Sequence, residues 1–167
     1  MLRKRTLKLT TLALTISFAM VLSYIESRIP AFVAIPGIKV GLANIAVIFT
    51  LYKLGVKEAI TVSVIRVILV SMLFGNPVSL IYSISGAILS LLIMVLLKKL
   101  TPLSAVAVSV TGGVMHNVGQ IAAASFMLST NVVLYYLPFL LVSGTIAGIV
   151  VGMVSAILVN KVKIENI

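Results

Sequence analysis

The sequence predicts an all-α integral membrane protein, a bundle of six transmembrane helices in a single domain that covers residues 1–167. Hydrophobic residues make up 61% of the chain and charged residues 10%, whereas soluble domains are about 45–50% apolar and about 25% charged. The mean hydropathy is +1.28. A water-soluble core of this size could not bury so much apolar surface, so lipid is the expected solvent.

The apolar residues fall into runs of the length that a membrane helix needs, about 17–25 residues. The first run covers about residues 7–25. A loop follows, because Pro30 and Pro36-Gly37 interrupt the helical pattern. The second segment, about residues 42–54, is short, and we expect it to extend back into this loop.

Four further spans are expected where the apolar runs resume. Gly75-Asn76-Pro77, Pro102 and Ser129-Thr130-Asn131 are turn and breaker signals between them. Pro138 is expected to bend the last span. The expected bounds are about 58–74, 78–97, 103–128 and 132–159.

The basic residues predict the orientation. Ten of the thirteen lysines and arginines fall before the first span, between the second and third, between the fourth and fifth, or after the sixth. Cytoplasmic loops carry an excess of basic residues. We therefore expect a cytoplasmic (inner) membrane protein with both termini on the cytoplasmic side.

The composition also excludes several kinds of chemistry. The chain has no cysteine, one histidine and, among its three acidic residues, no aspartate. No metal site and no cofactor are expected, since metal ions are held by clusters of such side chains. Nucleic acid is not an expected partner, because the basic residues lie between apolar runs rather than on a folded polar face.

Arg66 lies near the middle of the third span. A charged arginine in hydrocarbon costs between about 2.5 and 17 kcal/mol, depending on the reference state, so it should face protein or water and have a partner. One interpretation is structural, with Arg66 binding helix ends and loop carbonyls. The other is that Arg66 faces a cavity and binds an anionic ligand group.

A polar patch interrupts the fifth span at His116, Asn117 and Gln120. At 3.6 residues per turn His116 and Gln120 share a face, and Asn117 lies beside them. In lipid this patch should point inward, either to hold the bundle together by hydrogen bonds worth about 0.6–2 kcal/mol each or to bind a ligand.

The loop before the second span contributes Lys39 and Asn44 on the side opposite the basic ends. It could fold over the bundle as a lid or be an ordinary solvated loop. Together with Arg66 and the patch of the fifth span, these residues predict an outward-facing pocket of positive character.

Small residues at four-residue spacing predict close helix packing. Gly144, Gly148 and Gly152 form a doubled GxxxG pattern in the last span, where packing inside the bundle is expected. Ala13 and Ser17 form a similar pair in the first span. This second pair could equally meet a separate partner protein.

Several segments resemble one bacterial membrane family along essentially the whole chain. That family is described both as heptaprenyl diphosphate synthase component I and as Gx transporter. The segments that carry the resemblance are Pro36-Gly37-Ile38-Lys39-Val40-Gly41-Leu42-Ala43-Asn44-Ile45, Leu54-Gly55-Val56-Lys57-Glu58-Ala59, Arg66, Leu73-Phe74-Gly75, Tyr82-Ser83-Ile84-Ser85-Gly86, His116-Asn117-Val118-Gly119-Gln120 and Tyr135-Tyr136-Leu137-Pro138.

The resemblance adds Tyr82 to the candidate ligand-binding residues. Six helices, a cytoplasmic N-terminus and a long first external loop are also similar to the substrate-binding S components of energy-coupling factor transporters. By that analogy the Ala13/Ser17 face would contact a transmembrane coupling subunit, which works with cytoplasmic ATPases.

Three functions remain open at this point. The first is an S-component-like subunit that binds an anionic or carboxylated small molecule for uptake; the chain has no Walker A motif and could not power transport itself. The second is a non-catalytic membrane component of heptaprenyl or polyprenyl diphosphate synthesis, since catalysis would need Mg²⁺ held by aspartates. The third is a structural assembly factor, which the buried polar residues disfavour.

Overall fold

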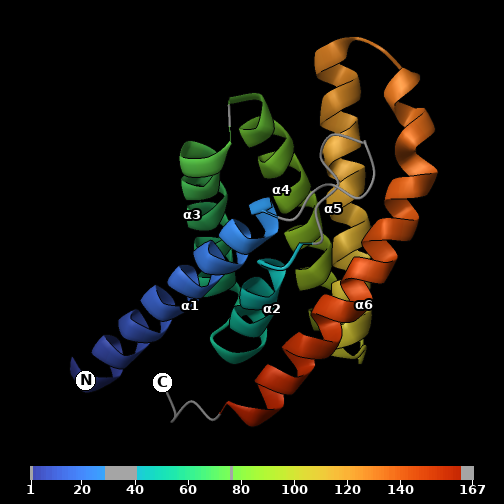
Figure 1. Ribbon diagram of the computed structural model, residues 1–167. Coiled ribbons are helices and arrows are strands. Elements are labelled where there is room, and N and C mark those ends of the chain that lie inside the picture. The colour runs from blue at the N-terminus through green and yellow to red at the C-terminus, as the bar shows by residue number, and fades with distance from the viewer. Residues whose placement is uncertain (1, 29–40, 76, 163–167) are drawn as a thin grey trace.

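The computed structural model describes residues 2–28, 41–75 and 77–162, which form six α-helices and one short 3-10 helix (Figure 1). No β-strand occurs in these ranges. The prediction of an all-α protein is confirmed, and the helices lie close to the predicted ranges. They are α1 (Leu2–Arg28), α2 (Asn44–Lys53), α3 (Val56–Phe74), α4 (Pro77–Leu100), α5 (Ala105–Leu128), η1 (Val132–Tyr136) and α6 (Leu137–Lys161).

Within the described ranges, three segments are long and apolar enough to cross a membrane: Lys4–Arg28, Pro77–Leu100 and Val132–Lys161. The chain is therefore a helical membrane protein. α3 and α5 are of comparable length, with 19 and 24 residues. Both carry polar or charged side chains within the helix, Arg66 in α3 and the patch around His116 in α5.

α2 is a short buried helix in the middle of the bundle. Its ten residues measure about 15 Å, half of a hydrocarbon core of about 30 Å. It packs against α1, α3 and α6, and Figure 1 shows it between them. Helix α2 does not continue through residues 41–43, because Gly41 has a φ of 75° and turns the chain there. The rest of the predicted extension falls on residues outside the described ranges.

The core of the protein surrounds α2. Ile45, Val47, Ile48 and Leu51 are buried, together with Ala19 of α1 and residues of α3 to α6. Three of the buried hydroxyl groups, those of Thr15, Thr50 and Ser155, each donate to the carbonyl four residues back in their own helix. Thr50, for example, donates to the carbonyl of Ala46 at 2.7 Å.

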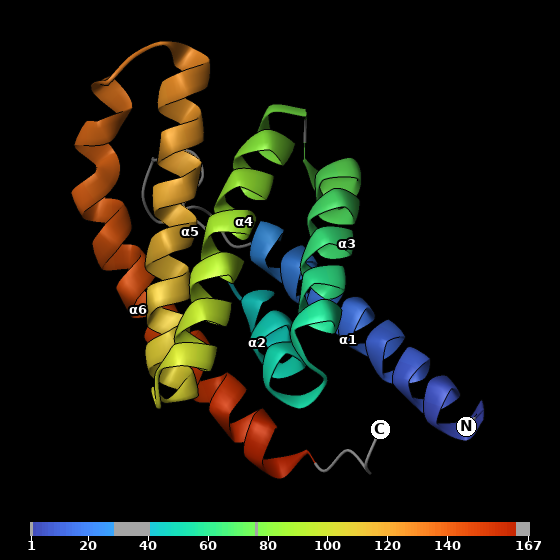
Figure 2. The same ribbon diagram turned by 180° about the vertical axis from the view of Figure 1, so that it is seen from behind.

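α5 lies between α4 and α6 and makes the most extensive helix contacts in the protein with these two (Figures 1 and 2). Glycines permit this close approach. A Cβ added to Gly148 of α6 would lie 2.6 Å from the Cα of Val110, and one added to Gly119 of α5 would lie 2.7 Å from the carbonyl oxygen of Ser85. Gly144 and Gly152 face α5 in the same way as Gly148.

Pro138 begins a helix instead of bending one, which corrects the expected single bent span. The 3-10 helix η1 ends at Tyr136, and α6 starts at Leu137 with Pro138 in its first turn. A proline in the first turn removes no helical hydrogen bond, because that N–H has no partner inside the helix.

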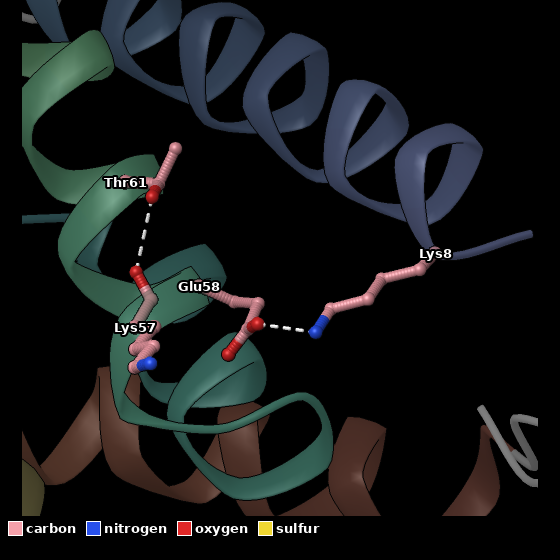
Figure 3. A network of polar contacts seen from close by, with 4 residues as sticks. All are labelled: Lys8, Lys57, Glu58 and Thr61. Carbon is pink, nitrogen blue, oxygen red and sulfur yellow. Dashed lines mark hydrogen bonds and ion pairs between the residues drawn. The ribbon is translucent and has the colours of Figure 1, made fainter. Parts of the chain in front are cut away.

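Most of the described basic residues lie at one end of the bundle, with Arg28 and Arg66 as the exceptions. The start of α1, the α2–α3 turn, the α4–α5 connection and the end of α6 all lie at this end (Figures 1 and 2). Here Lys8 of α1 forms an ion pair with Glu58 of α3 at 2.5 Å (Figure 3). Lys98 of α4 donates to the carbonyl of Leu51 and lies over the ring of Tyr52, which fixes α2 to α4.

Candidate ligand-binding pocket

A polar cavity of about 90 Å³ lies away from the basic end, where α1 ends and α2 begins. The second half of α3, the first half of α4 and the middle of α5 complete its wall. Because one water needs about 10–15 Å³ of such volume, the cavity has room for several waters or one small polar group. Its described lining residues are Ser23, Glu26, Ser27, Gly41, Asn44, Arg66, Val67, Val70, Ser71, Phe74, Gly75, Ser79, Ser83, His116, Asn117 and Gln120.

Among these lining residues, Arg66 is the side chain with a permanent positive charge. It occupies the middle of α3, and its Nε is buried without a hydrogen-bond partner in the described part of the chain. A buried guanidinium N–H left without a partner is costly, more so than a neutral donor. This atom therefore identifies a position where an added acceptor would be favourable.

Glu26 of α1 partly balances the charge of Arg66. Its carboxylate stabilises the guanidinium electrostatically, and its Oε1 accepts a hydrogen bond from the Gly41 backbone N–H at 2.5 Å. Glu26 thus holds the start of the α2 segment against the end of α1. A guanidinium has five N–H donors, and one carboxylate uses at most two of them in a bidentate pair, so Arg66 retains the capacity to bind a second acceptor.

The polar patch of α5 forms the opposite wall. The Asn117 side chain is buried, and its Nδ2 donates to the carbonyl of Leu140 in α6 at 2.7 Å. Asn117 therefore connects α5 to α6 as well as lining the cavity. Asn44, His116 and Asn117 also line a smaller cavity of about 30 Å³ between α2, α5 and α6.

Gly86 brings α4 close to this patch. A Cβ at Gly86 would lie 2.7 Å from the His116 carbonyl oxygen and 2.9 Å from Cγ of Gln120. Because Gly86 has no side chain, His116 and Gln120 of α5 pack closely against α4 and line the same cavity as Arg66 of α3.

Five of the candidate ligand-binding residues meet at this cavity: Asn44, Arg66, His116, Asn117 and Gln120. Tyr82 does not line it, although Ser79 and Ser83 of the same helix do. Lys39 lies outside the described residues.

The serines of the wall were missed by the sequence analysis. Ser23 and Ser27 of α1 and Ser79 and Ser83 of α4 are each four residues apart, so each pair shares one helix face. That spacing was the available signal, but serine is common in membrane helices and does not indicate a site by itself.

The two predicted small-residue faces have different surroundings. Gly144, Gly148 and Gly152 are buried against α5. Ala13 and Ser17 are exposed on the outer side of α1, beside Leu14 and Phe18, which are 65% and 45% exposed. In the described ranges no group of three His, Cys, Asp or Glu residues could hold a metal ion.

These observations define a class: a helical membrane protein with a polar pocket around one arginine. The family model of heptaprenyl diphosphate synthase component I matches residues 15–158, and the chain belongs to this family. The match includes every described residue of the pocket wall. Searches of the curated proteins and of the solved structures found no match.

Proposed function

We propose that this chain is the substrate-binding membrane subunit of a small-molecule uptake transporter, similar to the S components of energy-coupling factor transporters. The ligand is anionic or carboxylated. The observation that carries the proposal is the buried Nε of Arg66, a donor without a partner in the described residues, beside a polar cavity. An incoming acceptor would satisfy this group, which is costly to keep in lipid unpaired.

The proposed topology is a six-helix bundle in the cytoplasmic membrane of a bacterium, with both termini in the cytoplasm. The gathering of basic residues at one end supports it, because cytoplasmic loops are enriched in lysine and arginine. The Arg66 cavity then opens toward the outside, as uptake requires. α2 crosses only half of the bilayer and has its N-terminus at the pocket.

A transporter of this kind needs a separate source of energy. The chain has no phosphate-binding motif for ATP, so a coupling subunit with cytoplasmic ATPases would supply it. The exposed face of α1 around Ala13 and Ser17 is the proposed contact with that subunit, because small residues allow two membrane helices to approach closely.

A second candidate is a non-catalytic membrane component of heptaprenyl diphosphate synthesis. The family match favours it. A catalytic role is disfavoured because the chain has no aspartate to hold the Mg²⁺ that diphosphate chemistry uses. In this role Arg66 would bind a diphosphate. Co-expression with a polyprenyl diphosphate synthase tests it: activity that depends on this chain supports the role, and equal activity without it counts against the role.

Equilibrium binding of the purified protein to a panel of carboxylates and phosphates tests the transporter proposal. We expect at least one anion to bind saturably and Arg66→Gln to weaken it by about 10- to 100-fold, since hydrogen bonds to charged groups contribute about 1.5–3 kcal/mol. Arg66→Lys should restore part of the affinity.

Arg28→Gln is the matched control for this experiment. Arg28 ends α1 near the same side of the bundle, lies over the Tyr24 ring and is absent from the cavity wall. It should leave binding unchanged. No saturable binding of any anion, or equal losses for Arg28→Gln and Arg66→Gln, would contradict the proposal.

A further inference from the structure

An apolar groove of about 400 Å³ adjoins the polar pocket, on the seam between α3 and α4. Its lining presents no polar surface. The pocket and the groove share one wall residue, Val67. Along α4, the pocket residue Ser83 and the groove residue Ala87 lie one helical turn apart on the same face.

The two spaces follow the same helix faces. On α4, Ser79, Ser83 and Ala87 succeed one another at four-residue spacing, so they form one stripe; the two serines line the pocket and Ala87 lines the groove. On α3 the stripe runs from Ser71 at the pocket through Val67 to Ile60 in the groove. The seam is thus polar at one end and apolar at the other.

The dimensions of the two spaces complement each other. The pocket of about 90 Å³ holds little more than a charged head group, and the groove is several times larger. From Val67 to Val56 the groove follows α3 for about 16 Å at about 1.5 Å per residue, about half of the hydrocarbon core. A hydrocarbon chain fits this length and surface, whereas a water-soluble metabolite does not.

We propose that the ligand of the Arg66 pocket is an anionic amphiphile, with a carboxylate or phosphate head group at Arg66 and a single hydrocarbon chain along the α3–α4 groove. This inference rests on the proposed anion-binding function. The charge of Arg66 selects the head group, and the apolar groove, open along the seam, selects the chain. Such a ligand enters from the lipid, because the groove is lined by the exposed side chains of Ile88 and Leu92.

The chain has no tryptophan, so one introduced indole reports on one position. We place it in the groove with Leu92→Trp, and on the lipid face of α6, outside the groove, with Ile146→Trp; the native side chains are 55% and 59% exposed. Each variant is reconstituted in lipid nanodiscs and titrated with ω-bromododecyl phosphate, whose bromine quenches a nearby indole.

Saturable quenching of Leu92→Trp, with only linear quenching of Ile146→Trp, is the expected result. Adding Arg66→Gln to Leu92→Trp should weaken the saturable part by at least tenfold, whereas Arg66→Lys should retain part of it. Ala87→Phe, which fills the groove, should weaken it at least fivefold. Its matched control is Ala122→Phe on the exposed face of α5, which should not change it. Displacement by farnesyl phosphate or by dodecanoate supports the proposal and identifies the source of the chain.

Two failures are distinguishable. If inorganic phosphate or a short carboxylate binds in an Arg66-dependent way but quenching is linear at both tryptophans, the amphiphile is wrong and the proposed function stands. If neither head-group probes nor bromododecyl phosphate bind saturably, both are wrong. Equal effects of Ala87→Phe and Ala122→Phe overturn the assignment of the chain to the groove.

Discussion

Helix α4 forms one seam with α5 and another with α3, and the two seams are built from different residues. The seam with α5 holds the bundle together, whereas the seam with α3 contains the candidate site. Toward α5 the seam is closed by glycines, so that a Cβ on Gly119 would lie 2.7 Å from the carbonyl oxygen of Ser85. Toward α3 the facing side chains are larger, and α3 contains no glycine. This second seam holds both the polar pocket and the apolar groove. Close backbone contact leaves no room for a ligand, whereas side-chain contact leaves space.

The largest effect is expected from adding bulk to the closed seam. Gly119→Val should lower the free energy of unfolding by about 1–3 kcal/mol, because its methyl groups must displace the α4 backbone. Ala87→Val, the equivalent addition in the open seam, should change it by less than about 0.5 kcal/mol. Denaturant unfolding in detergent measures both. Similar losses for the two variants would remove the distinction between the seams.

Glu26→Gln removes the negative charge that lines the pocket beside Arg66. The glutamine still accepts the Gly41 N–H, but it no longer competes with an incoming anion for Arg66. We expect about tenfold tighter anion binding, which corresponds to about 1.4 kcal/mol. Equilibrium binding measures it. Weaker binding in this variant would mean that Glu26 contributes to ligand recognition instead of opposing it.

Asn117 has both a structural role and a place in the site, since it connects α5 to α6 and lines the pocket. Asn117→Ala removes the hydrogen bond to the Leu140 carbonyl and should lower stability by about 1 kcal/mol. Its effect on anion binding should be smaller than that of Arg66→Gln. Unfolding and binding assays on the same preparation separate the two roles, and a loss of binding without a loss of stability would contradict this division.

The sequence predicts the helices well because lipid imposes a simple rule: long apolar runs become helices. It fails where local chemistry decides, as at Pro138, which is tolerated in a first turn as readily as at a bend. The short α2 also depends on its neighbours, since Ile45–Ile48 are buried by α1, α3 and α6. The length of this apolar segment does not indicate that its residues are buried by other helices.

The candidate site was predictable where polar residues interrupt apolar runs, as Arg66, His116, Asn117 and Gln120 do. It was not predictable where residue identity is ordinary. Ser83 lines the cavity and its neighbour Tyr82 does not, because adjacent residues of a helix point about 100° apart. The motif contains both residues, and only the packing of α4 against α3 and α5 decides which of them lines the cavity.

The smallest effect is expected at the basic end, far from either seam. The Lys8–Glu58 ion pair joins two helix ends where Lys8 is well exposed, and such pairs contribute about 0.2–1 kcal/mol. Lys8→Met should therefore reduce stability by no more than about 1 kcal/mol and leave anion binding unchanged. Thermal unfolding at low and high salt measures this, and an effect as large as that of Gly119→Val would contradict it.

The central claim, that Arg66 holds the negative charge of a bound molecule, is tested most directly by an experimental structure of the protein purified from its native membrane. The account predicts density for a ligand whose anionic group contacts the guanidinium, with the remainder extending between α3 and α4. A guanidinium whose N–H groups are all taken by Glu26 and main-chain oxygens, in a cavity filled by side chains, would contradict it.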